Sequence, residues 1–310
     1  MSGSSMTPAA MVPRQKPDPI PAIHPLPEYA VEDQRAQWYA EMKAAFQVPW
    51  MGVVTMAYAH YPNFFAELWR GLKMLSESHA FVEAFVGNQA FVEAEVAKLG
   101  PRPITAALTD VGFAPREIIG VREMVEVFSH GNQPYVVTAL LTRLLLEGAD
   151  MGDNGQAVPF TGRHAPDVQV PFVLMEAHHA DAPTQEVYDD VKRVLGLPFV
   201  NTDYRAFARW PSYWAIAWGD LRQVAGGVAH EAICQAVHDR VLDQVLNALP
   251  NPGGLTSAGL RAAAAKDAPL DEVLQMARLF QWLLPGLVTN VAFLKAQLEA
   301  SARHDRRGPI

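Results

Sequence analysis

The stretch that decides the fold reads Tyr39-Ala-Glu-Met-Lys43, Val48-Pro49-Trp50, Tyr61-Pro62 and Trp69-Arg-Gly-Leu72. It returns 149 positions later as Tyr188-Asp-Asp-Val-Lys192, Leu197-Pro198-Phe199, Trp210-Pro211 and Trp218-Gly-Asp-Leu221. Nine of the 35 pairs from Tyr39/Tyr188 to Lys73/Arg222 are identical, and most others exchange like for like. Self-similarity at a fixed offset is the signature of a duplicated packing unit. We therefore expect two copies of one fold.

One aligned pair breaks this symmetry. Val54 in the first copy corresponds to Asp203 in the second, so a carboxylate replaces an apolar side chain. The residues around Asp203 are largely aromatic and include Tyr204, Phe207 and Trp210. A carboxylate enclosed by such groups loses water, which raises its pKa and makes it a better proton acceptor. The asymmetry indicates a functional site, although a carboxylate that only stabilises a first helical turn after Asn201 fits the same sequence.

Composition narrows the classes of function. The chain has 310 residues, half of them apolar, and a net charge of −8 without a basic run, so nucleic acid is not an expected partner. Cys234 is the only cysteine, which excludes an intramolecular disulfide and favours a cytoplasmic location. We predict no membrane span, because Arg143 interrupts the apolar run at 135–146 and the run at 283–294 is too short.

Helical spacing of apolar residues dominates the chain. The segments 116–147 and 270–298 both show it, and they correspond to each other at an offset of 155. The best candidate strand, 168–175, lies at the junction of the copies. The sequence predicts an all-α fold of two pseudo-repeats of about 130 residues, packed face to face with the active site between them. The predicted segments are a flexible leader at 1–27, repeat 1 at 28–148, a Gly- and Pro-rich linker at 149–167, repeat 2 at 168–300 and a tail at 301–310.

Two groups contain residue types that bind metals. His230-Glu231-Ala-Ile-Cys234 is similar to a zinc-protease helix, but a cysteine stands where the second histidine is needed. The other group contains Glu176, His178, His179 and Asp181. It lies near the linker and before a proline, which is typical of a solvated turn. We predict no bound metal at either group and no cofactor.

The segment His130-Gly-Asn132-Gln-Pro-Tyr135 interrupts a helical run with residues that open the backbone. A plain turn between two helices explains it, and so does a break that presents the amide of Asn132 and the phenol of Tyr135 to a neighbouring cavity. Trp50 is equally consistent with the hydrophobic core and with a pocket wall.

Taken together and in this order, Val48-Pro49-Trp50, Tyr61-Pro62, Trp69-Arg70, the break at Gly131-Asn132 and Thr202-Asp203 with Trp210-Pro211 resemble the group I 2-haloacid dehalogenases. The resemblance spans about residues 28–298. It implies an all-α homodimer that hydrolyses 2-haloalkanoic acids to 2-hydroxyalkanoic acids with inversion, on both D and L substrates, without metal or cofactor.

The resemblance also implies roles for individual residues. Asp203 would activate water and Asn132 would help to hold it, while Trp50, Tyr135 and Thr202 would line the substrate pocket. Val53 and Phe280 occupy pocket positions that can be phenylalanine and tyrosine in the family, so the pocket volume and one hydrogen bond differ here. The alternatives are a non-catalytic helical protein that binds a small carboxylic acid, and a hydrolase that uses a metal at Glu176, His178, His179 and Asp181.

Overall fold

The computed structural model describes residues 8–153 and 156–304, and within these ranges the chain is helical. No strand forms in them, and the single isolated β-bridge joins Ser78 to Pro159. The candidate strand at 168–175 is extended chain without a sheet partner. The prediction of an all-α fold is therefore confirmed.

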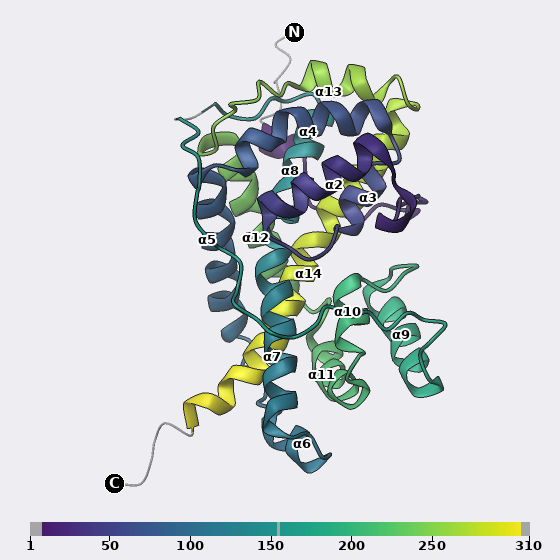
Figure 1. Ribbon diagram of the computed structural model, residues 1–310, viewed down its shortest axis with the longest axis vertical. Coiled ribbons are helices and arrows are strands. Elements are labelled where there is room, and N and C mark those ends of the chain that lie inside the picture. The colour runs from purple at the N-terminus through teal and green to yellow at the C-terminus, as the bar shows by residue number, and fades with distance from the viewer. Residues whose placement is uncertain (1–7, 154–155, 305–310) are drawn as a thin grey trace. The chain divides into compact units, whose positions relative to one another are not determined.

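The helices follow the chain in two series (Figure 1). The first series is α1 (Pro8–Met11), the 3-10 turn η1 (Glu28–Ala30), α2 (Asp33–Phe46), α3 (Val53–Tyr58), α4 (Pro62–Ser76), α5 (His79–Ala97), α6 (Thr105–Asp110), α7 (Pro115–Gly131) and α8 (Gln133–Leu146). The second series is α9 (Ala182–Leu195), α10 (Thr202–Phe207), α11 (Pro211–Val224), α12 (Val228–Asn247), α13 (Ser257–Ala264) and α14 (Leu270–His304).

The helix boundaries reproduce the sequence repeat. Helices α2, α3, α4 and α5 begin 149 residues before α9, α10, α11 and α12, and α7 begins 155 residues before α14. Local signals recur as well, because Pro62 and Pro211 stand in the first turns of α4 and α11, where proline is tolerated. Both α2 and α9 end in a left-handed residue, Gln47 (φ 50°) and Gly196 (φ 63°).

Tyrosine anchors recur at equivalent positions. The Tyr39 hydroxyl donates to the carbonyl oxygen of Leu26 at 2.9 Å, and the Tyr188 hydroxyl donates to that of Met175 at 2.7 Å. All four residues obey the offset of 149. The duplication therefore extends from the sequence pattern to individual hydrogen bonds.

Indole–carboxylate bonds recur in the same way. Nε1 of Trp69 donates to Glu41 at 2.8 Å, and Nε1 of Trp218 donates to Asp190 at 2.8 Å. Each bond joins the helix that follows the short central helix to the helix that precedes it. An N–H bonded to an ionised acceptor is stronger than a neutral pair. These bonds therefore fix the angle between α2 and α4, and between α9 and α11.

The chain forms two compact units that do not follow the two repeats. Unit 1 contains residues 1–88, 131–165 and 235–285, and unit 2 contains residues 89–130, 166–234 and 286–310. Each unit thus combines the first three helices of one copy with later helical segments of the other. The long helices α5, α12 and α14 pass from one unit to the other.

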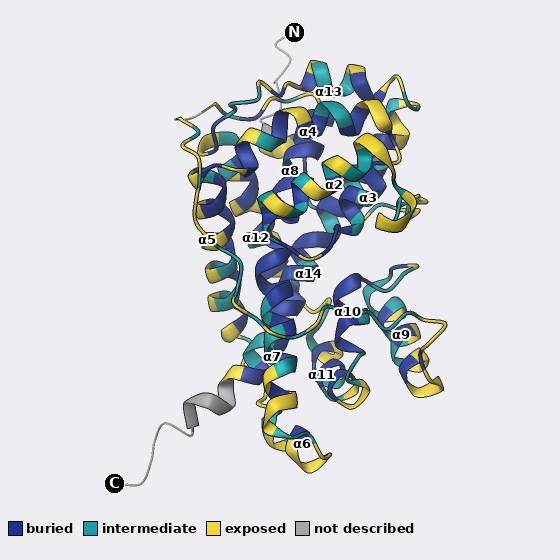
Figure 2. Cartoon of the chain, in the orientation of Figure 1, coloured by how far each residue is buried: buried dark blue, intermediate teal, exposed yellow. Residues whose placement is uncertain are grey.

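The core of unit 1 centres on α8, in which all residues from Gln133 to Leu146 are buried (Figure 2). Helix α13 packs against α8 and α4. Arg143 lies within this core, where it pairs with Glu147 and donates to the side chain of Gln281 and to the carbonyl oxygen of Pro13. A buried guanidinium needs such partners because desolvation penalises its charge.

Part of the segment predicted as a flexible leader is anchored in unit 1. Val12 is buried, Arg14 donates to the carbonyl oxygen of Trp282 at 3.2 Å, and Lys16 lies over the Trp282 ring at 5.3 Å. Residues 1–7 of that segment, and residues 305–310 of the predicted tail, lie outside the described ranges. The proline-rich composition of residues 1–27 did not predict that Val12 would be buried.

Unit 2 is organised around aromatic side chains of α10 and α11. Tyr204 stacks on Trp214 with ring centroids 5.1 Å apart, and Phe207 packs edge-on against Phe128 of α7 at 5.5 Å. All four rings are buried. Their burial contributes apolar contact that positions the short helix α10.

Helix α14 is long and apolar enough, over 270–299, to cross a membrane by length and composition alone. In the structure 78% of its most apolar window is buried by the protein itself, as expected for a core helix. The prediction of no membrane span at 283–294 considered this apolar run alone and found it too short. The helix that contains this run extends beyond it at both ends.

We predict that Trp69→Phe and Trp218→Phe each lower the free energy of unfolding by about 1.5–3 kcal/mol, since each removes a hydrogen bond to a carboxylate. Urea denaturation of the variants measures this. Trp38→Phe is the matched control, because the half-buried Trp38 makes a ring contact with Phe65 and no carboxylate contact is found for it among the described residues. Equal effects at positions 38, 69 and 218 would contradict a specific role for the indole–carboxylate bonds.

Candidate active site

Asp203 is the second residue of α10 and is only 2% exposed. Its equivalent in α3, Val54, is also 2% exposed. The fold therefore buries a carboxylate as completely as it buries a valine in the other copy. Because desolvation of an ionised carboxylate is costly, such a position requires polar compensation or a function. Asp203 also lies in the first turn of α10, after the N-cap Asn201, so the alternative interpretation, stabilisation of that turn, agrees with the structure as well.

A polar network holds the neighbouring residue, Tyr204. Nδ2 of Asn290, on α14, donates to the Tyr204 hydroxyl at 2.9 Å, and Oδ1 of Asn290 lies 2.8 Å from Nε2 of His230. Burial raises the pKa of Tyr204 well above its usual value, and the nearby charges of Asp203 and Cys234 raise it further. Tyr204 therefore remains a neutral phenol at physiological pH, and its ring and hydroxyl are both fixed beside Asp203.

The outer side of α10 carries an ion pair. Arg205 donates two hydrogen bonds to Glu176, both at 2.8 Å, and one to the Thr202 hydroxyl at 3.3 Å. Both bonds to Glu176 come from Nη1, and hydrogen bonds between ionised groups are stronger than those between neutral groups. Arg205 thus tethers the first turn of α10, which contains Thr202 and Asp203, to the segment before α9.

In unit 1, Trp50 and Tyr135 are in direct contact. Their ring centroids are 6.2 Å apart, and the Tyr135 hydroxyl donates to the carbonyl oxygen of Trp50 at 2.9 Å. Both residues are buried, and burial raises the pKa of Tyr135 far above its usual value. Tyr135 is therefore a permanent donor that holds the Val48-Pro49-Trp50 turn in place.

Two glycines make room for these rings. A Cβ atom on Gly52 would lie 2.8 Å from the Tyr135 ring, and one on Gly131 would lie 2.4 Å from the Trp50 ring and 2.9 Å from Val48. Real Cβ atoms do not approach other atoms this closely. The absence of a side chain at both positions is thus a packing requirement of the Trp50–Tyr135 pair.

Three further predicted site residues, Asn132, Val53 and Phe280, belong to unit 1. Asn132 is the N-cap of α8 and separates it from α7, so the predicted helix break is confirmed. Val53 is half-buried and opens α3, at the position equivalent to Thr202 in α10. Phe280, on α14, packs edge-on against Tyr58 of α3 at 6.1 Å. The catalytic and binding roles predicted for these residues stay predictions.

The structure distinguishes the two groups of residues that could bind a metal. The carboxylate of Glu176 accepts hydrogen bonds from Arg205. Asp181 is the N-cap of α9, where its carboxylate accepts from the backbone N–H of Thr184 at 3.0 Å. Hydrogen bonds from the side chain of Thr184 and from its backbone N–H hold the pKa of Asp181 below its usual value. Of the described residues, His230, Glu231 and Cys234 are the set with donor atoms close enough to share an ion.

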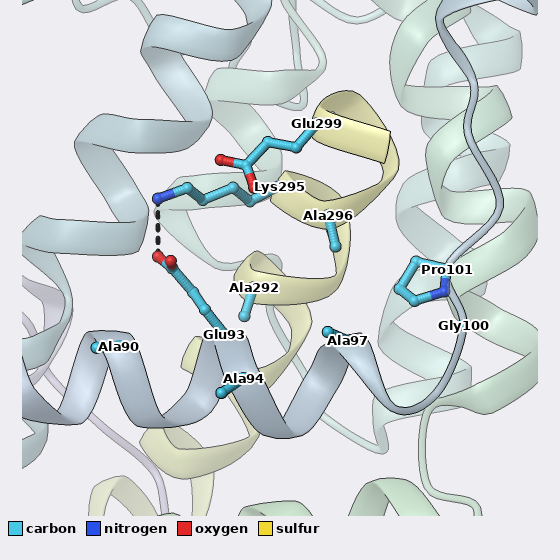
Figure 3. A pocket seen from close by; sticks show the side chains of 10 residues that line it. All are labelled: Ala90, Glu93, Ala94, Ala97, Gly100, Pro101, Ala292, Lys295, Ala296 and Glu299. Atoms are coloured by element: carbon cyan, nitrogen blue, oxygen red, sulfur yellow. Dashed lines mark hydrogen bonds and ion pairs between the residues drawn. The ribbon is translucent and has the colours of Figure 1, made fainter. Parts of the chain in front are cut away.

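One cavity in unit 2 is separate from the predicted site residues. It has a volume of about 590 Å³ and lies between α5 and α14 (Figure 3). Alanines line it, and Lys295 pairs with Glu93 across one side at 2.8 Å. None of the seven predicted site residues lines it. Its walls carry two carboxylates, Glu93 and Glu299, and Glu93 is paired with Lys295. We do not assign the reaction to this cavity, because none of the predicted site residues reaches it.

Sequence reasoning missed Asn290. It is a buried amide that links Tyr204 to His230. Two signals were available: Thr289-Asn290 is a polar pair inside the apolar run at 283–294, and Asn290 stands 155 residues after Tyr135, the repeat offset of these helices. The repeat thus places a hydrogen-bonding side chain at this position in both copies.

Comparison with known proteins gives a consistent result. No family model matches the chain. The chain is 42% identical over 245 residues to an (R)-2-haloacid dehalogenase of Rhizobium sp. (strain NHG3), covering 79% of this chain and 95% of the relative. It is 34% identical over 298 residues to an (R)-2-haloacid dehalogenase of Pseudomonas putida, covering 91% and 96%.

A solved structure agrees with these relatives. The fold is similar to that of a D-2-haloacid dehalogenase in complex with L-LA, with a TM-score of 0.83 and 32% sequence identity. The similarity covers 92% of this chain and 99% of the other. It therefore extends through both series of helices.

We predict that Gly131→Ala lowers the free energy of unfolding by about 1–3 kcal/mol, because the added methyl group overlaps the Trp50 ring. Chemical denaturation followed by tryptophan fluorescence measures it. Gly219→Ala is the matched control, since nothing lies within 4 Å of a Cβ atom there and alanine favours the interior of α11. A Gly131→Ala protein as stable as the control would show that Trp50 is not packed as described.

Proposed function

The chain belongs to the family of 2-haloacid dehalogenases, hydrolases that act on carbon–halide bonds, and from this premise we propose a direct-displacement mechanism for it. A water molecule activated by Asp203 attacks C2 of a 2-haloalkanoic acid, inverts that carbon and releases halide, without an ester intermediate. The observation that supports this most is the burial of Asp203 at a position where the other copy has Val54.

The chemistry favours a neutral nucleophile. The substrate carries a carboxylate beside the reacting carbon, so a second anion that approaches this carbon is repelled. Water avoids much of that repulsion, provided that a base takes its proton as the C–O bond forms. The carbon–halogen bond breaks with its electron pair on the halide, and the proton passes to Asp203. A single carboxylate suffices, which gives a physical reason for the apolar Val54.

We assign the other groups as follows. The Asn132 amide holds the attacking water, and Trp50, Tyr135 and Thr202 line the substrate pocket together with Val53 and Phe280. Because Tyr135 already donates to the carbonyl oxygen of Trp50, it acts as a rigid wall and does not exchange protons during the reaction. Phe280 has no hydroxyl, so it contributes shape and no hydrogen bond.

The names of the relatives support a proposal about the preferred enantiomer. The two relatives above 30% identity are both named for the (R) enantiomer, and the similar D-enzyme structure holds a ligand of L configuration, as inversion of a D substrate would produce. We therefore propose that the (R), or D, enantiomer is the better substrate. The dual D and L range implied by the sequence resemblance becomes the quantity to measure. We retain a homodimer and a cytoplasmic location as proposals.

We predict that Asp203→Asn folds as the unmodified protein does and releases halide about 10²–10⁴-fold more slowly, since general-base catalysis contributes about this factor. Halide release from 2-chloropropionate measures turnover, and circular dichroism verifies the fold. Asp189→Asn removes an exposed carboxylate of α9 and serves as the matched control with unchanged turnover. Near-full activity of Asp203→Asn would reject the assigned base.

We predict that (R)-2-chloropropionate is converted to (S)-lactate, and that the rate with the (S) substrate is at least about tenfold lower, which corresponds to about 1.4 kcal/mol of discrimination. Separate incubations with each enantiomer, followed by halide titration and chiral analysis of lactate, test this. Equal rates would restore the broader D and L range. Halide from neither substrate would instead favour the alternative, a non-catalytic protein that binds a small carboxylic acid.

A further inference from the structure

Three potential metal ligands lie on one turn at the start of α12. Nδ1 of His230 is 3.6 Å from Sγ of Cys234 and 3.6 Å from a carboxylate oxygen of Glu231. All three donor atoms lie within 4.8 Å of one another. Ligands of one tetrahedral zinc-class ion, bound at about 2.0–2.3 Å, are separated by about 3.3–3.6 Å. The three side chains are thus close to a chelating arrangement.

A second layer of side chains orients these donors. Oδ1 of Asn290 accepts from Nε2 of His230 at 2.8 Å, which places the lone pair of the imidazole on Nδ1. Nδ1 faces Cys234 and Glu231 and accepts from the backbone N–H of Gly226 at 3.3 Å, a bond that a bound ion would replace. The Thr289 hydroxyl lies 3.6 Å from Sγ of Cys234. Metal-binding histidines commonly donate their other N–H to a carbonyl or carboxylate in this way. Neighbouring residues of α14 therefore support two of the three ligands.

From this geometry we propose that His230, Glu231 and Cys234 bind one thiophilic divalent cation of the zinc class. The thiolate and the carboxylate neutralise the two positive charges, and three protein ligands leave one position for water. Cys234 and His230 are buried, whereas the Glu231 side chain is 45% exposed and gives the ion a route from solvent. The cysteine that argued against a zinc-protease helix thus becomes a ligand of a different site.

The site is connected to the neighbour of Asp203. Asn290 accepts from His230 and donates to the hydroxyl of Tyr204, so an ion on Nδ1 polarises a chain of hydrogen bonds that ends one residue from Asp203. A regulatory effect of the ion on turnover rests on the proposed function. Binding itself does not, and its measurement requires no turnover.

Cobalt(II) tests the site directly, because a thiolate bound to cobalt gives a near-ultraviolet charge-transfer band. Cys234 is the only cysteine, so the band reports on this site alone and not on the other histidines. We expect the band to saturate at one cobalt per chain in the full-length protein and to disappear when zinc is added. No band in excess cobalt would overturn the proposal.

Variants separate a chelating site from simple binding to a thiol. Glu231→Gln and His230→Gln are each expected to weaken cobalt binding at least about tenfold, and Asn290→Leu to weaken it by about 10–100-fold through the outer hydrogen bond. Asp243→Asn, an exposed change on the same helix, is expected to leave the affinity unchanged. Because Glu231 is exposed, its variant tests the site even where a buried substitution impairs folding. Unchanged affinity in Glu231→Gln would overturn the three-ligand assignment.

Discussion

An ionised side chain in a hydrophobic core must be stabilised by its surroundings, and Asp203 imposes this constraint on the whole of α10. The fold buries Asp203 to the same extent as Val54, although the carboxylate loses far more solvation than the valine. The two residues that follow it in the chain are each held by hydrogen bonds. Asn290 fixes the hydroxyl of Tyr204, and Arg205 ties the first turn to Glu176. Val54 in the other copy has no charge to compensate, and this difference separates a structural helix from a proposed catalytic one.

Much of the fold could be predicted from the sequence, because the duplication leaves local signals. The aligned Trp69 and Trp218 mark equivalent indole–carboxylate bonds, and prolines mark equivalent helix starts. Apolar spacing gave the all-α class, and the polar residues around Asn132 gave the break between α7 and α8. Each of these depends on residues close together in the chain. The burial of Asp203 could be anticipated because its aromatic neighbours lie within a few positions.

Long-range pairing could not be predicted in the same way. The repeats of the sequence do not correspond to the compact units, since each unit takes helices from both copies. A repeat signal shows that two segments are alike and does not show which partner each one packs against. The burial of Val12, within a proline-rich segment, and the two bonds of Asn290 depend on such distant contacts. The proximity of His230, Glu231 and Cys234 was visible as helical spacing, but the support from Thr289 and Asn290 was not.

The central claim is that Asp203 takes a proton from water and does not itself attack the substrate. A single turnover in heavy-oxygen water, with enzyme in excess over (R)-2-chloropropionate, tests it most directly. The account predicts one heavy oxygen in the lactate hydroxyl and none in the peptide that contains Asp203. Unlabelled lactate together with a labelled Asp203 side chain would show that an ester forms and is hydrolysed, and would contradict the account.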